Sequence, residues 1–565
     1  MNARRSLAWL FVLALGVVAA ARTASAAGDE LAMHHGMAMA DTSAPAPLFD
    51  GLGKYHRAIS TRSPLAQRYF DQGMGFLWGF NLHEAQRSFE ECARLDPACA
   101  MCEWGVALSL GPHFNIPALP ERTVAANGHA LEAIERLAGA TPVERGLAEA
   151  LAKRYSDPAP SNPDDQKKLD SDYAQAMRAL MEKYPADDDV AALYCEALMD
   201  LRPWDLWTVE QRPQPGTLEL IATLERILAR DPEHPGANHY YIHAVEPSPH
   251  PEKGLASAER LKKLDSVAGH LTHMPSHIYE RVGRYDDAYA ANARALQQDR
   301  AYEVKAKPMQ PETFYPMYTA HNAQFLSWTA MKQGRSAAAF RYARLSITKM
   351  PPEMFDMMPG FDLFLTTPVL AYVRFGKWDE VLAQPAPAKY YPYLAAIWHY
   401  ARGLAYAGKG QAPAATLELD SLLAIAKGIP PGATEANNSA ELLLTIAQRS
   451  LSGVIAIREG RTEEGLRLLS DAVRAEDQTR YDEPTDWLVP VRHTLGAALL
   501  EAGRPAEAEL VYRADLERNR ENGWALFGLA ESLRRRGRTQ EAAAVQKRFE
   551  KAWAHADVKL TASSY

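Results

Sequence analysis

Residues 66–97 read AQRYFDQGMGFLWGFNLHEAQRSFEECARLDP, and this stretch decides the fold. Apolar residues recur every three to four positions on both sides of a short turn, which predicts two amphipathic helices. Gly73 would let the two helices approach closely, while Ala85 and Phe89 would pack between them. Pro97 would end the unit, because proline cannot continue a helix. The stretch therefore predicts a helix-turn-helix hairpin.

The same pattern returns along the chain, at residues 277–299, 325–345, 494–516 and 524–553. Each copy contains a periodic helix, a turn with Gly-Arg and a second periodic helix. These units resemble the tetratricopeptide repeat, a hairpin of about 34 residues that stacks on its neighbours. The resemblance implies an all-α superhelical solenoid of antiparallel helix pairs. Proline-containing stretches at 303–319 and 350–387 break the period, so we expect irregular inserts there.

Several phrases point to a narrower group within the repeat proteins. They include CAMCEWG at 99–105, DPEHPGANHYYIHAVEPSPHPE at 231–252 and HMPSHIYERVGRY at 273–285. These phrases resemble one family of exported bacterial tetratricopeptide proteins, from about Ile59 to the C-terminus. The resemblance implies a fold and carries no activity to this chain.

The first 26 residues predict a signal peptide and export to a periplasm. Arg4 and Arg5 precede an apolar run from Leu7 to Ala21, and small residues lead to a cleavage site after Ala26. The adjacent arginines leave both general and twin-arginine export open. No other segment approaches a membrane span.

Composition and motifs divide the rest of the chain. Residues 27–58 are small, polar and proline-containing, which predicts disorder. We expect a repeat array with the functional site over 59–302, a unit with inserts over 303–388, and a C-terminal array over 389–565.

The formal net charge is −8, and no basic stretch favours nucleic acid. Phosphate loops, nucleophile elbows and HExxH zinc-protease motifs are missing from the sequence.

Four cysteines stand in a chain expected to reach an oxidising compartment: Cys92, Cys99, Cys102 and Cys195. At least one disulfide is expected among the first three. The sequence leaves their pairing open. Covalent haem is not expected, because no histidine follows Cys102.

Histidine is concentrated in one part of the chain. Seven of the 17 histidines fall between His234 and His277. Two of them recur at the repeat period, since 273 − 239 = 34 and 277 − 243 = 34. Imidazoles are therefore expected on equivalent faces of adjacent repeats.

The repeat register places these side chains on one surface. In tetratricopeptide proteins the first helix of each repeat lines the concave groove. Residues at i, i+3, i+4 and i+7 of that helix lie on one face. Neighbouring helices lie about 10 Å apart, close enough for their side chains to share an ion. Seven residues from three successive first helices are expected to face the groove: His239, His243, Glu246, His270, His273, His277 and His321.

Six neutral imidazoles predict a transition-metal site with His239, His243, His270, His273, His277 and His321 as ligands. Copper is favoured over zinc or iron because Met33–Met39, MHHGMAM, adds softer ligands. Copper would indicate an oxidoreductase, whereas zinc would indicate hydrolysis with Glu246 as the general base. The number of ions stays open. The alternative is a metal-free scaffold that binds a peptide or partner protein in the groove.

Pro275 complicates the register. Proline removes a backbone donor and clashes with the preceding helical turn. The helix is expected either to begin near Met274 or to kink there. In the first case, His270 and His273 would lie on an incoming loop.

Overall fold

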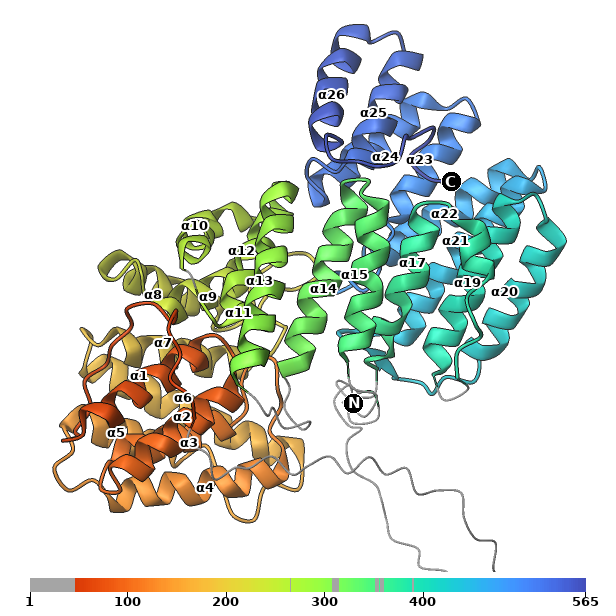
Figure 1. Cartoon of the computed structure of the whole chain (residues 1–565). Coiled ribbons are helices and arrows are strands. Elements are labelled where there is room, and N and C mark those ends of the chain that lie inside the picture. The colour runs from red at the N-terminus through yellow and green to blue at the C-terminus, as the bar shows by residue number, and fades with distance from the viewer. Residues whose placement is uncertain (1–45, 265, 307–314, 351–354, 356–359, 389–390) are drawn as a thin grey trace, which may run out of the picture.

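The computed structural model describes residues 46–264, 266–306, 315–350, 355, 360–388 and 391–565. Within them, antiparallel helix pairs stack one after another from α1 near the N-terminus to α26 near the C-terminus (Figure 1). One pair of two-residue strands is present among these residues, β1 (Thr434–Glu435) and β2 (Asn438–Ser439). The expected fold class, an all-α tetratricopeptide solenoid, is confirmed.

The first part of the array holds the N-terminal pairs and the region that carries the histidines. Its helices are α1 (Pro64–Trp78), α2 (Leu82–Leu95), α3 (Ala100–Leu110), α4 (Pro120–Glu135), α5 (Pro142–Leu151), α6 (Pro163–Lys183), α7 (Asp188–Asp200), α8 (Thr217–Arg230), α9 (Pro235–Val245), η1 (Pro251–Gly254), α10 (Leu255–Lys263), α11 (Gly269–His273), α12 (Pro275–Arg281), α13 (Tyr285–Lys305), α14 (Tyr315–Lys332) and α15 (Ser336–Lys349).

The second part continues the stack to the C-terminus. Its helices are η2 (Asp362–Thr366), α17 (Thr367–Arg374), α18 (Trp378–Leu382), α19 (Pro392–Gly408), α20 (Ala412–Ala426), α21 (Ala440–Arg458), α22 (Thr462–Glu476), α23 (Val491–Glu501), α24 (Pro505–Arg518), α25 (Gly523–Arg535) and α26 (Thr539–Ala552). Among the described residues, one helix, α21, is long and apolar enough to cross a membrane, and 56% of its apolar 18-residue window is buried among its neighbours.

The first hairpin forms as its sequence predicts. A Cβ added to Gly73 would lie 2.5 Å from Phe89 Cε1, and one added to Gly105 would lie 2.3 Å from Phe89 Cδ1. The Phe89 ring of α2 therefore fills the space against both α1 and α3. Asn81 caps α2 by accepting a hydrogen bond from the Glu84 amide at 3.2 Å.

The turns between paired helices repeat one geometry. In the α12–α13 turn, Gly283 has a φ of +78°, and the Arg284 amide donates to the Tyr279 carbonyl at 2.7 Å. The α1–α2 turn has the same bond, from the Asn81 amide to the Phe76 carbonyl. There Phe80 holds the glycine's place with a φ of +56°. A left-handed conformation costs a side-chain-bearing residue on the order of 1 kcal/mol, so the ring is held there by its packing.

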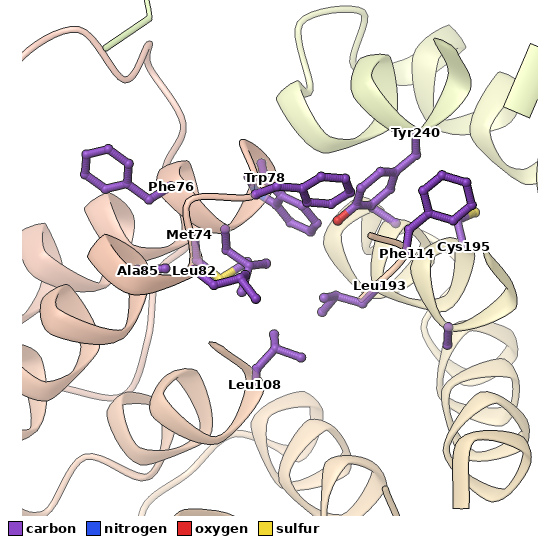
Figure 2. Close-up of a cluster of buried hydrophobic side chains, with 14 of the residues drawn as sticks. Met74, Phe76, Trp78, Leu82, Ala85, Leu108, Phe114, Leu193, Cys195 and Tyr240 are labelled. Carbon is purple, nitrogen blue, oxygen red and sulfur yellow. The ribbon is translucent and has the colours of Figure 1, made fainter. Parts of the chain in front are cut away.

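Two large hydrophobic clusters support the array, one mostly N-terminal and one mostly C-terminal, and α14 contributes to both. Figure 2 shows part of the first, where Trp78 from α1, Tyr240 from α9 and Phe114 from the loop after α3 lie close together. This packing joins the N-terminal hairpins to the helix that carries the first two candidate ligands.

Some expectations need correction. Residues 46–58, expected to be disordered, pack on the array: the Phe49 amide donates to Gln72 Oε1 at 2.7 Å, and Arg57 pairs with Asp187 and Asp189. The insert expected over 350–387 is partly regular, because α17 and α18 form a short hairpin. The signal peptide and the Met33–Met39 stretch lie outside the described residues.

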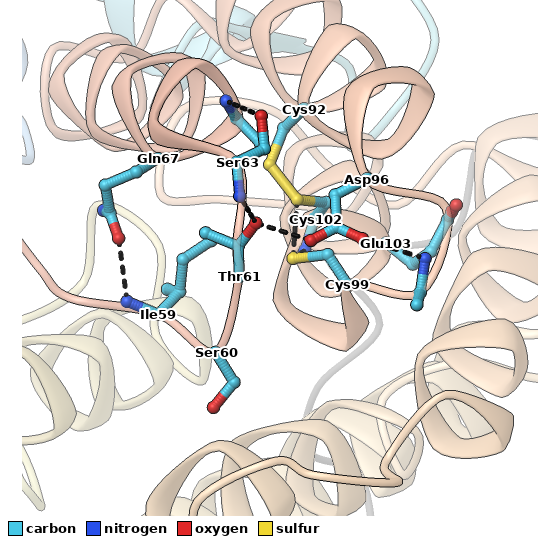
Figure 3. The surroundings of a disulfide bond; sticks show 12 residues. Ile59, Ser60, Thr61, Ser63, Gln67, Cys92, Asp96, Cys99, Cys102 and Glu103 are labelled. Atoms are coloured by element: carbon cyan, nitrogen blue, oxygen red, sulfur yellow. Dashed lines mark hydrogen bonds between the residues drawn. A yellow bond between two sulfur atoms is a disulfide. The ribbon is translucent and has the colours of Figure 1, made fainter.

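The cysteines show one bond and one close thiol. Cys92 of α2 is joined to Cys102 of α3, which ties two successive helices together (Figure 3). Cys99 remains a buried thiol whose Sγ lies 2.7 Å from that of Cys102. Burial raises the pKa of Cys99 to about 12, so the thiol stays protonated.

Candidate metal centre

Three helical segments bring the predicted ligands together. Helix α9 carries His239 and His243, α11 and α12 carry three more histidines, and α14 carries His321. Helix α11 ends at His273 and Pro275 begins α12, which agrees with the expected kink near Met274 rather than with a helix that begins there. Met274 between them keeps right-handed helical geometry, with φ −49° and ψ −36°. The break therefore changes direction only locally, and His270 and His273 stay on a helix.

The six histidines form two sets of three. In the first set, the ligand atoms of His239, His243 and His270 lie within 4.8 Å of one another. In the second set, the same holds for the remaining three side chains, which are His273, His277 and His321. Contacts within the second set are the shorter ones: His273 Nε2 lies 2.7 Å from His277 Nε2 and 3.0 Å from His321 Nε2. In the first set, the Nε2 atoms of His239 and His243 lie 3.1 Å apart.

The other ring nitrogens identify the tautomers of two histidines and place a third beside a carboxylate. His239 Nδ1 lies 2.6 Å from the Trp78 carbonyl, which can only accept. His273 Nδ1 lies 2.5 Å from Asn292 Oδ1, whose amide nitrogen already donates to a backbone carbonyl. His277 Nδ1 lies 2.8 Å from a carboxylate oxygen of Glu246. The Nδ1 atoms of His239 and His273 carry the proton, so each of these two neutral rings turns an Nε2 lone pair inward.

The facing nitrogens need a cation between them. Two Nε2 lone pairs separated by 2.7 Å, as in His273 and His277, repel one another unless a proton or a metal ion lies between them. Burial lowers the pKa of His239 and of His321 to about 3. Burial, followed by the neighbouring imidazoles, also holds the pKa values of His243, His270 and His273 well below the usual range. A proton on any of these five rings is therefore a poor candidate at neutral pH.

His270 belongs to the first set but also lies near the second. Its ring centre is 5.0 Å from that of His239 and 5.6 Å from that of His273. Both ring nitrogens are buried and neither has a hydrogen-bond partner. A buried imidazole with no partner is costly, because it has lost its contacts with water. Both nitrogens of this ring are thus available as ligand atoms.

Two carboxyl groups stand behind the second set. Glu246, at the end of α9, and Glu483 lie 2.8 and 3.5 Å from His277 Nδ1. Tyr481 donates a hydrogen bond to Glu483. Burial raises the pKa of Glu483 well above its usual range, and repulsion from Glu246 adds to that shift. Burial also disfavours ionised Glu246, but attraction to His277 leaves the pKa of Glu246 below its usual value. The pair therefore combines one ionised and one protonated carboxyl group.

The site is covered rather than open to a groove, contrary to the expectation. His239, His273 and His277 are fully buried. The Phe80 ring centre lies 4.4 Å from that of His239, and Phe325 lies 4.9 Å from His277. The loop after α22, which carries Tyr481 and Glu483, covers the other side. Side chains from distant parts of the solenoid therefore fill what the repeat register alone presents as concave surface.

Several residues of this centre do not follow from the sequence pattern. Glu483 and Tyr481 lie in the phrase RYDEPTDW at 480–487, far from the histidines along the chain. Phe80 and Asn292 resemble ordinary turn and packing residues. Phe80 offers one signal, since it occupies a turn position that other repeats give to glycine.

Three other groups of possible ligands occur among the described residues. Glu246, His277 and Glu483 form one that overlaps the second histidine set. Cys92, Cys99 and Cys102 form another, but two of these sulfurs are joined in the disulfide. The third group, Glu103, His129 and Glu132, is partly exposed, and the Glu103 carboxylate also pairs with Arg136.

Comparisons with known proteins add little to this geometry. No protein family profile matches the chain, and no curated protein matches it by sequence. Similar solved structures include human IFIT1 with m7Gppp-AAAA, at 12% identity and a TM-score of 0.32, covering 87% of this chain and 91% of that one. Yeast Tom70 is similar at 10% identity and a TM-score of 0.28, covering 85% and 89%. At these scores the likeness carries no statement about function.

Proposed function

We propose that this chain binds two transition-metal ions, one in each three-histidine set. The observation that carries the proposal is the close approach of Nε2 lone pairs, above all the 2.7 Å between His273 and His277. Three imidazoles are a common ligand set for a transition metal with an open coordination position. The ring centres of His243 and His277 lie 5.7 Å apart, which makes the two sites immediate neighbours.

We propose copper ahead of zinc or iron. The inner ligands are all neutral imidazoles, which suit copper and zinc, and the carboxylates stand behind them. The softer His/Met stretch at 33–39 adds weight to copper. When bound, a pair of copper ions supplies redox chemistry with dioxygen, and we therefore favour an oxidoreductase over a zinc hydrolase.

The chain's own residues would hold and shield the ions. The Trp78 carbonyl and Asn292 accept from the Nδ1 atoms of His239 and His273, and a Glu246 carboxylate oxygen lies 2.8 Å from His277 Nδ1, so these groups favour the ring orientations that turn Nε2 inward. This contact favours a positioning role for Glu246, whereas its role as a general base with zinc stays a prediction. Phe80 and Phe325 would exclude bulk water from the ions.

We also propose that the protein acts in the periplasm after removal of residues 1–26. The support is the signal-peptide pattern. The Cys92–Cys102 disulfide is also of a kind that persists in an oxidising compartment such as the periplasm. Sequencing the N-terminus of protein recovered from the periplasmic fraction tests this point. Mature protein should begin after Ala26, and intact chain confined to the cytoplasm would contradict the assignment.

Metal titration tests the proposed function. Chelator-treated full-length protein would be titrated with Cu(I), Cu(II) and Zn(II) in the presence of a competing chelator, with uptake measured after desalting. We expect saturation near two equivalents with copper bound more tightly than zinc. Saturation by zinc alone would assign the two sites to zinc instead of copper. The absence of stoichiometric uptake would favour the metal-free scaffold.

A further inference from the structure

A second polar site lies in the C-terminal part of the array. A small recess lies where α14, α17, α23 and the start of α25 come together. Arg374, Lys332, His493 and Trp524 line it. Its enclosed space is about 10 Å³, room for about one water-sized group, so only the polar end of a small ligand would enter it.

Arg374 is the unusual residue in this recess. Its side chain is 4% exposed, and its guanidinium carbon lies 3.5 Å from the centre of the Trp524 ring. Nη1 donates to His493 Nδ1 at 3.0 Å. Nη2 is buried and has no hydrogen-bond partner. Arg374 therefore keeps a donor available on its guanidinium.

The nearby carboxylates are already engaged. Asp515 accepts from His493 Nε2 at 2.9 Å, and it also accepts from the side-chain amides of Asn519 and Asn522. Glu280 pairs with the Lys332 ammonium at 2.9 Å. Among the described residues, no carboxylate forms an ion pair with Arg374. The guanidinium is thus a buried cation without a direct counter-charge.

Arg374 stays charged despite its burial. Burial lowers its pKa to about 9, and attraction from Asp515 only partly opposes that shift. At neutral pH the side chain is still a cation. Buried cations in proteins are paired or bind an anion, because an unpaired one has lost its hydration. Guanidinium donors match the planar oxygens of a carboxylate especially well.

We propose that this recess binds a small carboxylate anion through the guanidinium of Arg374. The anion supplies the missing counter-charge, and Trp524 forms one wall. This site is separate from the histidine centre and needs no metal. The carboxylate comes either from a free small acid or from the end of a peptide chain, and both offer the same group.

The test uses full-length protein with acetate as the probe. The midpoint of thermal unfolding and the heat of binding would be followed as sodium acetate replaces sodium perchlorate at constant ionic strength. We expect a saturable rise in the midpoint, because a ligand of the native state stabilises it. Arg374→Gln should weaken acetate binding at least about tenfold, since it removes a charge-assisted hydrogen bond. Arg374→Lys keeps the charge but lacks the planar pair of guanidinium donors. Its affinity for acetate should lie between that of the unchanged protein and that of Arg374→Gln.

Controls separate this site from general salt effects. Arg548→Gln removes an exposed arginine of α26 that pairs with Glu521, and it should respond to acetate as the unchanged protein does. A short peptide with a free C-terminal carboxylate, compared with its amidated form, identifies the source. Binding of acetate supports the proposal with a free acid as ligand, and binding of the free peptide alone supports it with a chain end as ligand. No saturable effect of either, or equal effects in Arg374→Gln, would overturn it.

Discussion

The Nε2 atoms of His273 and His277 lie 2.7 Å apart in the fully buried interior of the solenoid, and the Nδ1 atoms of the two rings face Asn292 Oδ1 and a carboxylate oxygen of Glu246. The two residues belong to different short helices, one on each side of Pro275. Two facing lone pairs at this distance need a cation between them, and a metal ion bound by both rings would supply it.

The two histidine sets should lose metal separately. The double substitution His273→Ala and His321→Ala should remove about one of two metal equivalents, because only the second set loses its ligands. The substitution of His239 and His243 should remove the other. Elemental analysis of each purified variant measures the ratio, with the exposed His56→Ala as control. If either double variant loses all metal, the six imidazoles act as one indivisible site.

Glu246 should strengthen metal binding without being a metal ligand itself. Glu246→Gln keeps the shape but removes the charge behind His277, and it should weaken metal binding by about 10–100-fold. Competition with a chelator measures the affinity, and circular dichroism reports the fold. Glu252→Gln, on the partly exposed η1 segment, serves as the matched control. A complete loss of one metal ion in Glu246→Gln would indicate that the carboxylate is itself a ligand.

Stability should fall in acid because of buried neutral histidines such as His113. Burial lowers the pKa of His113 to about 3, with neighbouring arginines adding to the shift. The unfolded chain binds the proton below pH 6.5, while the folded one does not until about pH 3. This contribution is therefore present above pH 6.5 and is lost as the pH falls.

The size of the acid effect can be measured by substitution. Between pH 7.5 and 5.0, His113 should account for roughly 2 kcal/mol of lost unfolding free energy. Urea unfolding of metal-free protein at both pH values measures the loss, which should shrink in His113→Gln and not in the exposed His56→Gln. An unchanged loss in His113→Gln would mean that His113 is protonated in the fold.

Close helix contact at Gly73 should be essential to the first hairpin. In Gly73→Ala the new methyl group would meet the Phe89 ring at 2.5 Å, which should destabilise the protein by about 1–3 kcal/mol. Gly128→Ala in α4 is the matched control, since no atom lies within 4 Å of its added Cβ. There, alanine should raise stability by about 0.5–1 kcal/mol through helix propensity. Equal effects of the two substitutions would contradict the packing.

Sequence periodicity accounts for the hairpins because the contacts within a hairpin are local. Gly73 and Phe89 are 16 residues apart and meet as the repeat pattern predicts. The same register placed His239 beside His243 and His273 beside His277. Periodicity alone cannot supply Glu483 or Phe80, because loops and turns from other repeats reach the centre through the superhelical curvature. For that reason the sequence predicted an open groove where the structure has a buried site.

Metal content of the untagged protein tests the central claim most directly. Protein purified from the periplasm without an affinity tag, and without added metal or chelator, would be assayed by elemental analysis against protein concentration from amino-acid analysis. We expect about two equivalents of transition metal, mostly copper, per chain. Protein that contains none, and that still binds none after reconstitution with copper, zinc and iron, would contradict the account.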